Sequence, residues 1–217
     1  MLASNKNVSA ALGYENRFFI PELSIRKAGM VIKTGNSSEC FMISYFGFTG
    51  YRRIEGSVGS GLQLSKNISA GLQVDYFSER IPGEDYHRQA ITFEGGALYK
   101  VSEKVRVGFH LFNPLPAAMR KEYLPSVIVC GAGIDLSSTL YAAAEVEKCS
   151  GKALNARCGF EYEALKKLRI RGGFSTDNSA FSFGVGYNVK SVSVDLAFST
   201  HEKLGVSSAI SVAYKIK

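Results

Sequence analysis

The sequence has no tryptophan, only five prolines and no uninterrupted apolar run of the roughly 18 residues that a membrane-spanning helix needs. The missing run excludes a conventional transmembrane helix. A hydrophobic content of 46% and a mean hydropathy of +0.01 also exclude a disordered chain and a helical membrane protein. The 217 residues fit a single domain, 1–217, because barrels commonly reach this length without dividing.

A signal peptide is also missing from the start of the chain. The first ten residues, MLASNKNVSA, have neither a basic segment nor an apolar core. Two interpretations stay open at this point: a cytoplasmic protein, or a mature or trimmed form of an exported one.

Motifs for chemistry are equally scarce. The four cysteines, Cys40, Cys130, Cys149 and Cys158, show no CxxC or Cys/His spacing, so no metal site or cofactor is predicted, although one disulfide is left open. His87 and His201 fall in expected loops, and His110 lies on a polar strand face without a recognisable catalytic partner. The sequence therefore predicts no catalytic residues and a protein that is not an enzyme.

The charge is positive but dispersed. A formal net charge of +7 is compatible with an anionic partner such as nucleic acid or lipid headgroups. The basic residues, however, occur as scattered pairs such as Arg52-Arg53 and Lys166-Lys167, with no dense run and no RNA-binding motif. We therefore expect no nucleic-acid partner.

What the sequence does have is strand periodicity. Glycine (22 residues) and phenylalanine (14) are frequent, and apolar residues occupy every second position in most segments after residue 50. About fourteen strands are predicted: Val8–Phe18, Leu23–Lys33, Cys40–Phe48, Ile54–Ser65, Asn67–Phe77, Gln89–Val101, Val105–Phe112, Ser126–Leu136, Thr139–Lys148, Ala153–Glu163, Leu168–Ser175, Ala180–Asn188, Ser191–Ser199 and Ser208–Lys217. The fold class is all-β.

Short and longer connections alternate between these strands. The segments 66–67, 102–104, 137–138, 164–167 and 188–190 are short, whereas 78–88, 113–125 and 200–207 are longer. Outer-membrane barrels have tight turns on one side and longer loops on the other. The alternation therefore indicates a transmembrane antiparallel up-and-down β-barrel located in a bacterial outer membrane, in contact with its lipid.

The polar face of the strands carries charges of both signs in mid-strand. In a small soluble barrel such residues face outwards, but fourteen strands enclose a lumen too wide for side chains to fill. A charged side chain facing lipid would also cost roughly 2–4 kcal/mol. We therefore expect these residues to face the lumen: Asp75, Glu94, Arg106, Glu145, Arg157, Glu161, Arg169, Arg171 and Asp195. Glu161 is expected to pair with Arg169 or Arg171, either to line a pore or for structure alone.

The C-terminal stretch FSFGVGYNVKSVSVDLAFSTHEKLGVSSAISVAYKI, residues 181–216, resembles the ending of the PorV/PorQ-like bacterial outer-membrane barrels, which are related in fold to the fatty-acid channel FadL. Asp195, His201, Leu204, Gly205 and Ser207 match the pattern of that ending. Weaker matches follow in the same order along the chain: YENRFFIPEL (14–23), FNP (112–114), LPSVIVCGAG (124–133) and GFEYEALKKLRIRGGF (159–174).

The resemblance implies two roles for a non-enzymatic barrel: passage or binding of small or hydrophobic molecules, or docking of a secretion or surface-protein partner, as in type IX secretion. It also implies that the N-terminal segment 1–23 associates with the lumen, with Phe18, Phe19 and Ile20 as contacts for an apolar ligand. The alternative that the residues leave open is a soluble ligand-binding β-barrel.

Overall fold

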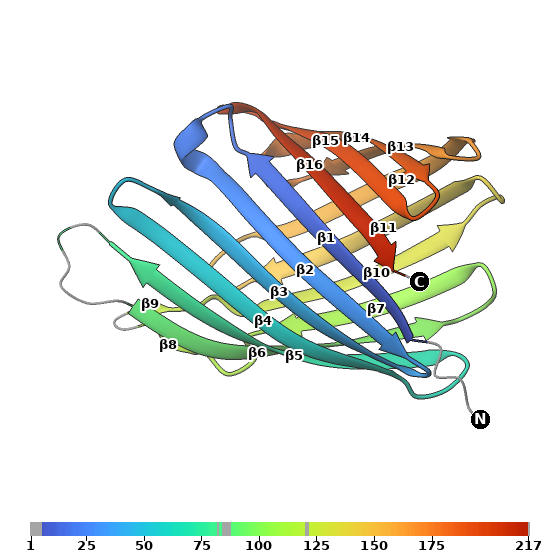
Figure 1. The fold of residues 1–217 in the computed structure, drawn as a ribbon, viewed down its shortest axis with the longest axis horizontal. Coiled ribbons are helices and arrows are strands. Elements are labelled where there is room, and N and C mark those ends of the chain that lie inside the picture. Colours follow the sequence, from blue (N-terminus) through green and yellow to red (C-terminus); the bar gives the residue numbers. More distant parts are fainter. Residues whose placement is uncertain (1–5, 82, 84–87, 120–121, 217) are drawn as a thin grey trace.

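The computed structural model describes residues 6–81, 83, 88–119 and 122–216, and fourteen of its strands form one closed antiparallel barrel (Figure 1). Their bounds are β1 Lys6–Asn16, β2 Ser24–Thr34, β3 Ser37–Phe48, β4 Tyr51–Gln63, β5 Ile68–Arg80, β6 Arg88–Lys100, β7 Val105–Phe112, β10 Val127–Asp135, β11 Leu140–Cys149, β12 Leu154–Leu165, β13 Leu168–Ser175, β14 Ala180–Val189, β15 Val192–His201 and β16 Gly205–Ile216. Two short strands, β8 (Ala118–Met119) and β9 (Glu122–Tyr123), pair with each other between β7 and β10.

The topology is up-and-down. Each barrel strand pairs antiparallel with its neighbours in the chain, β7 pairs with β10 across the β8–β9 hairpin, and β1 pairs with β16 to close the cylinder. The all-β fourteen-stranded barrel predicted from the sequence is thus confirmed. Closure leaves the barrel without a free sheet edge, since every strand has a hydrogen-bonded partner on both sides.

The two ends of the barrel differ. At the end that we call the turn end, both chain termini lie together with the connections 35–36, 64–67, 101–104, 136–139, 166–167 and 190–191 (Figure 1). At the opposite end, the loop end, the connections are 17–23, 49–50, 81–87, 113–126, 150–153, 176–179 and 202–204. The short turns were predicted at one end, as observed. The prediction of a long 200–207 loop is wrong, because Gly205 adopts φ 93° and turns the chain tightly after β15.

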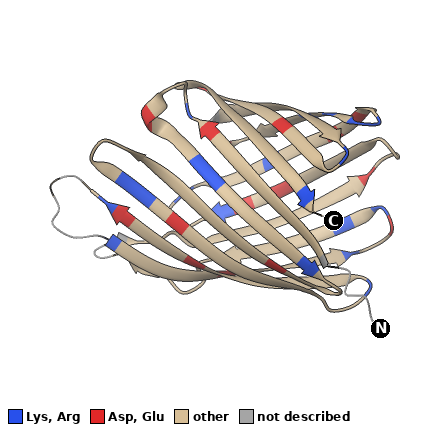
Figure 2. Ribbon diagram, viewed as in Figure 1, with Lys and Arg blue, Asp and Glu red and all other residues tan. Residues whose placement is uncertain are grey.

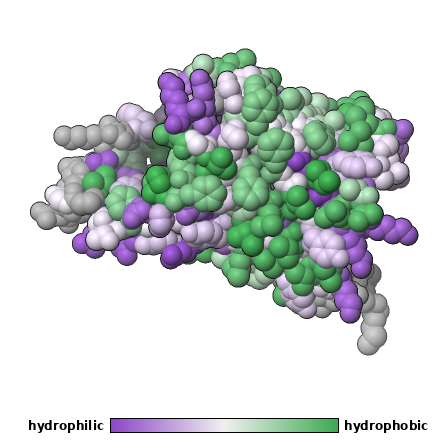
Figure 3. Space-filling view, turned by 90° about the horizontal axis from the view of Figure 1, so that it is seen from above, coloured by the Kyte–Doolittle hydropathy of each residue, from purple (hydrophilic) through white to green (hydrophobic). Residues whose placement is uncertain are grey.

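The two faces of the sheet differ in chemistry. Along β5, Val74 and Tyr76 are 54% and 40% exposed on the outer face, whereas Asp75 between them is 1% exposed. Large apolar side chains cover the middle of the outside and polar residues gather towards the two ends (Figure 3). Two tyrosines lie on the inner face: Tyr51 donates a hydrogen bond to Glu79, and the Arg106 guanidinium lies 5.3 Å above the ring of Tyr141.

The start of the chain belongs to the barrel wall. β1 pairs with β16 and β2 along its whole length, so its residues do not form a segment inside the lumen. Residues 1–5 of the segment 1–23 lie outside the described residues. A 3-10 helix, Pro21–Leu23, leads from the loop end into β2.

Candidate functional site

The mid-strand charges all lie on one face of the sheet. Nine charged residues stand at least three positions from both ends of their strand, and the cross-strand register places all nine on the inner face: Lys27, Glu55, Asp75, Glu94, Glu145, Arg157, Glu161, Arg171 and Asp195. The charges visible in Figure 2 otherwise lie mostly towards the strand ends. The lumen is therefore the polar surface of this barrel, and its surface is the candidate site.

One side of the lumen is organised around arginine. We call the inner face of β11–β15 the arginine wall, with Glu145, Arg157, Glu161, Arg171 and Asp195 at its centre. The Arg171 Nε donates to Glu161 at 2.6 Å and its Nη1 donates to Asp195 at 2.6 Å. Arg171 thus bridges two carboxylates on two other strands, an arrangement suited to a forked guanidinium.

Glycine on β14 makes the contact between Arg171 and Asp195 possible. Arg171 on β13 and Asp195 on β15 are separated by β14, where Gly184 and Gly186 face the lumen between them. A Cβ atom at Gly186 would lie 2.5 Å from the Asp195 Oδ1 and 3.4 Å from the Arg171 guanidinium. Only a residue without a side chain lets the arginine lie flat across the intervening strand.

The remaining arginines of this side are paired in the same way. Arg157 lies directly opposite Glu145, with 3.2 Å between Nη1 and Oε1, and also contacts Glu147. Arg169 forms a longer ion pair with Glu161, at 3.7 Å, and donates a hydrogen bond to Asn188, so Glu161 accepts a hydrogen bond from Arg171 alone of the two arginines that the sequence offered as partners. Near the turn end Arg106 donates to Asp135 at 2.6 Å.

The other side of the lumen is different. We call the inner face of β4–β6 the acidic wall, with Glu55, Asp75 and Glu94 on three adjacent strands. Among the described residues, Glu94 pairs with His110, at 3.0 Å, and no ion pair with lysine or arginine involves Glu55 or Asp75. The Asp75 Oδ1 accepts from the Gln73 amide at 2.8 Å, and the Gln73 carbonyl oxygen in turn accepts from the Cys40 thiol.

Between the two sides lies a cavity of about 800 Å³. Much of its lining is glycine, which leaves the lumen wide, and the polar groups at its border include Arg106, His110, Tyr141, Glu145 and Arg157. Inward glycines that line it are Gly71, Gly96, Gly108, Gly131, Gly133 and Gly159. This volume is large enough for a small organic molecule.

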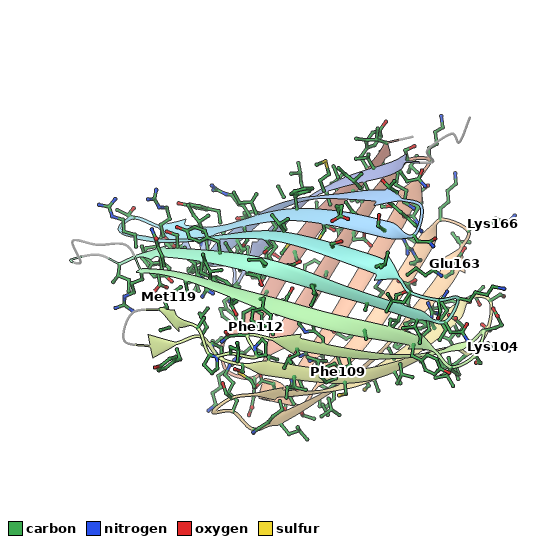
Figure 4. All side chains as sticks on the ribbon, turned by 90° about the horizontal axis from the view of Figure 1, so that it is seen from below. Lys104, Phe109, Phe112, Met119, Glu163 and Lys166 are labelled. Carbon is green, nitrogen blue, oxygen red and sulfur yellow. The ribbon has the colours of Figure 1, made fainter. Side chains whose placement is uncertain are left out.

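The 113–126 connection folds against the inner wall near the loop end. Met119 of β8 packs on the inward side chains of Phe77 and Ala90, with Phe112 and Leu124 beside them. Figure 4 shows Met119 and Phe112 towards the loop end, whereas Lys104, Glu163 and Lys166 mark the turn end. The hairpin therefore covers part of the loop-end entrance above the acidic wall.

Asn113 holds this connection in place. It is fully buried, its backbone is left-handed at φ 50°, and its amide oxygen accepts from Thr92 at 2.7 Å and from the Ala117 backbone at 3.0 Å. Its amide nitrogen donates to the Leu124 carbonyl oxygen at 2.7 Å. Asparagine tolerates this conformation better than most residues. The FNP motif was noted in the sequence, but its role as the anchor of an inward fold was missed.

The nine lumen candidates predicted from the sequence share the inner face, where seven of them lie at the arginine wall or beside it and two lie on the acidic wall. Glu55 and Lys27, which complete the mid-strand set, were missed, although their alternation with Ile54 and Ala28 gave the same signal. All four cysteines are free, and Cys130 and Cys158 are exposed on the outer face.

The proposed ligand contacts Phe18, Phe19 and Ile20 lie together at the loop end, in the connection between β1 and β2. Phe18 and Phe19 both adopt left-handed backbone conformations, with φ 58° and 55°. The Phe18 ring packs edge-on against His201, with 5.7 Å between centroids, while Phe19 is 63% exposed. The structure thus brings the three side chains to the barrel mouth and away from the charged centre of the lumen.

Within the described ranges, no cluster of three or more His, Cys, Asp or Glu side chains is arranged to hold a metal ion. The described residues also contain no helix of the length and apolarity needed to cross a membrane. His87 lies outside the described residues.

Known structures share this fold. The toluene transporter TbuX of Ralstonia pickettii superimposes with a TM-score of 0.73 at 11% identity, over 100% of this chain and 90% of its own. The monoaromatic hydrocarbon channel CymD gives a TM-score of 0.73 at 11% identity, over 98% and 89%. The toluene transporter TodX of Pseudomonas putida gives 0.69 at 10% identity, over 99% and 90%.

These likenesses define a class of fold: an outer-membrane-type barrel of the kind that the hydrocarbon channels use. At such low identities they show the fold and not a shared substrate. No protein-family model matches the sequence, and no curated protein matches it either.

Proposed function

We propose that this chain is an integral barrel of a bacterial outer membrane through which small molecules pass without chemical change. The observation that carries the proposal is the division of surfaces: a closed barrel with its apolar side chains outside and every deep mid-strand charge inside. In lipid this arrangement satisfies all backbone groups and keeps charges in water. A soluble ligand-binding barrel would require the reverse arrangement of faces.

The test is whether the lumen conducts. Gly108 faces the cavity, and a Cβ atom there would lie 3.6 Å from Leu98 and 3.9 Å from the Ala97 carbonyl oxygen, which are ordinary contacts. We expect Gly108→Trp to lower single-channel conductance in planar bilayers by about twofold or more, because the indole fills part of a cavity of drug-like size.

Gly56 provides the matched control. It lies opposite Tyr76 and Ile43 on the outer face, and a Cβ atom there would meet nothing within 4 Å. Gly56→Trp should leave conductance unchanged. Equal conductance of both variants, or a wild-type protein that stays soluble without detergent and does not conduct, would contradict passage through the lumen.

A hydrophobic cargo is the second candidate, and the mouth of the barrel favours it. The side chains of Phe19 and Ile20 are exposed beside the entrance. The backbones of Phe18 and Phe19 are both left-handed, and backbone strain of this kind often marks binding sites. The names of the similar channels mention toluene and monoaromatic hydrocarbons, which are cargoes of this class.

We expect Phe19→Ala to reduce the amount of apolar ligand that remains bound after purification. The measurement is mass spectrometry of extracted ligand per mole of barrel, with Phe48→Ala at the neighbouring loop-end strand as control. Unchanged retention in Phe19→Ala would remove this segment from the binding site. Docking of a secretion or surface partner, and membership of the PorV/PorQ-like group, stay predictions from the resemblance.

A further inference from the structure

The centre of the lumen has the opposite charge to the whole protein. The chain carries a formal net charge of +7, yet the nine charged residues deep inside the strands comprise six acids and three bases. The positive excess therefore lies towards the barrel ends, where Figure 2 shows much of the lysine and arginine. A solute that reaches the middle of the barrel meets a net negative surface.

This excess is concentrated on the acidic wall. Glu55, Asp75 and Glu94 follow one another on β4, β5 and β6, and Glu55 lies one pair away from Asp75 in the register. The neighbouring cations are engaged elsewhere: Lys27 lies 3.8 Å from Glu15, and the Arg53 guanidinium stands 5.2 Å above the ring of Phe77. The three carboxylates therefore lack the arginine partners that those on the opposite side have.

Two buried polar atoms within this wall have no partner at all. The Asp75 Oδ2 and the Ser57 Oγ make no hydrogen bond, although Asp75 is 1% and Ser57 is 4% exposed. Ser57 and Asp75 are directly opposite each other across the β4–β5 pair, on the same face. Buried oxygens are almost always satisfied, and a buried carboxylate is stabilised by a positive partner or by hydrogen-bond donors. The unpartnered hydroxyl oxygen of Ser57 is an observation independent of the acidic residues. It points to a ligand that binds to oxygen atoms.

A cavity lies beside this niche. It has a volume of about 340 Å³ and is bordered by Cys40, Gly59, Gln73, Glu94 and His110, and the Gln73 amide donates to Asp75. The niche offers a small number of hydroxyl, amide and carboxylate oxygens, and such a set suits a monovalent cation or an ammonium group.

We propose that the acidic wall contains a binding site for a monovalent cation, formed by Ser57, Asp75 and Glu94 with Glu55 at its border. An alkali metal ion and the ammonium group of an organic solute share the required chemistry. As a determinant of selectivity the site rests on the proposed channel function; as a binding site it does not.

Binding is tested first, without any need for conduction. In detergent-solubilised barrel, we expect the sodium NMR line to be broader with wild type than with Asp75→Asn or Ser57→Ala, and added methylammonium to narrow it by competition. Glu147→Gln is the matched control, because it removes the same charge from the lumen while Arg157 keeps Glu145. Equal line widths for wild type and both site variants would overturn the proposal.

Selectivity is tested next, in planar bilayers with a potassium chloride gradient. Wild type should prefer potassium over chloride, and Glu94→Gln or Glu55→Gln should lower the permeability ratio by about threefold, the order of effect of one unit charge at close range in water. Glu147→Gln should change the ratio much less, since its loss leaves a compensated pair.

The outcomes separate the two proposals. A barrel that binds sodium but conducts nothing would refute passage and keep the site. A barrel that conducts without cation preference, and whose preference no acidic-wall variant changes, would refute the site and keep passage. Methylammonium that fails to compete while potassium succeeds would restrict the ligand to metal ions.

Discussion

The acidic wall and the arginine wall belong to the same lumen and come from the same alternating pattern, yet they satisfy their charges differently. On the arginine wall each deep carboxylate faces a guanidinium on another strand, as with Glu145 opposite Arg157 and Glu161 opposite Arg171. On the acidic wall Asp75 faces Ser57 and Thr92, neither of which carries charge. Whether a carboxylate in this barrel is paired with a cation thus depends on the residues of the neighbouring strands, and not on the composition of the lumen as a whole.

The two walls also differ in what covers them. The β8–β9 hairpin packs on the inner side chains of β5 and β6 near the loop end, whereas the connections above the arginine wall, such as 150–153 and 202–204, are short. The acidic wall therefore lies partly beneath protein at the loop end, whereas Glu145 and Arg157 of the arginine wall border the open cavity. Ion pairs that border an open cavity stabilise the barrel wall. Unpaired carboxylates in a covered niche favour the binding of a positively charged ligand.

Loss of the central arginine should have the largest effect on this contrast. Arg171→Gln leaves Glu161 with one distant partner and Asp195 with none, and we expect about 2 kcal/mol of lost stability, less than for a fully buried pair because these side chains are partly exposed. The measurement is the urea midpoint of the heat-modifiable gel shift after folding into lipid vesicles.

Glu55→Gln, on the acidic wall, is the comparison for the same assay. It removes a charge that makes no ion pair with lysine or arginine among the described residues, so the midpoint should stay unchanged or rise. If Glu55→Gln destabilises the barrel as much as Arg171→Gln does, the distinction between a compensated wall and an uncompensated one is wrong.

A smaller effect is expected from releasing the cover of the acidic wall. Asn113→Ala removes hydrogen bonds to Thr92, Ala117 and Leu124, and the cost should be about 1–2 kcal/mol, localised at the loop end. We expect faster proteolysis within 113–126 and a higher conductance, since Met119 no longer packs on the wall.

Asn155 is the matched residue on the other side of the barrel. Its side-chain oxygen accepts from Ser175, Thr176 and the Asp177 backbone, so it anchors the short loop-end connection 176–179. Asn155→Ala should loosen that connection and leave conductance as it is. A conductance increase of equal size in both variants would show that the hairpin over the acidic wall does not restrict the lumen.

Much of the fold was predictable, because each strand satisfies a local rule. The alternation in Leu154–Leu165 and Leu168–Ser175, with a tight turn between them, predicts both strands, their faces and a pairing of Glu161 with Arg169 or Arg171. Contacts between strands that follow each other in sequence need only the turn and the register. Thirteen such steps, closed by the pairing of β1 with β16, give the barrel, and its diameter follows from the strand number.

Contacts beyond the nearest strand were not predictable. The link from Arg171 to Asp195 crosses β14 and depends on Gly186, and the inward fold of 113–126 depends on a left-handed Asn113. The left-handed backbones of Phe18 and Phe19 likewise have no counterpart in a period of two. These features depend on atoms brought together from distant strands.

The alternating pattern of the chain is enough to predict the number of strands, the two faces and the short turns at one end, because a strand's side chains alternate whatever lies around it. Which carboxylates contact an arginine, and which do not, becomes visible only in the folded barrel. That choice depends on the register between strands and on the space that a glycine or a folded loop leaves, and neither quantity is written in any single stretch of chain.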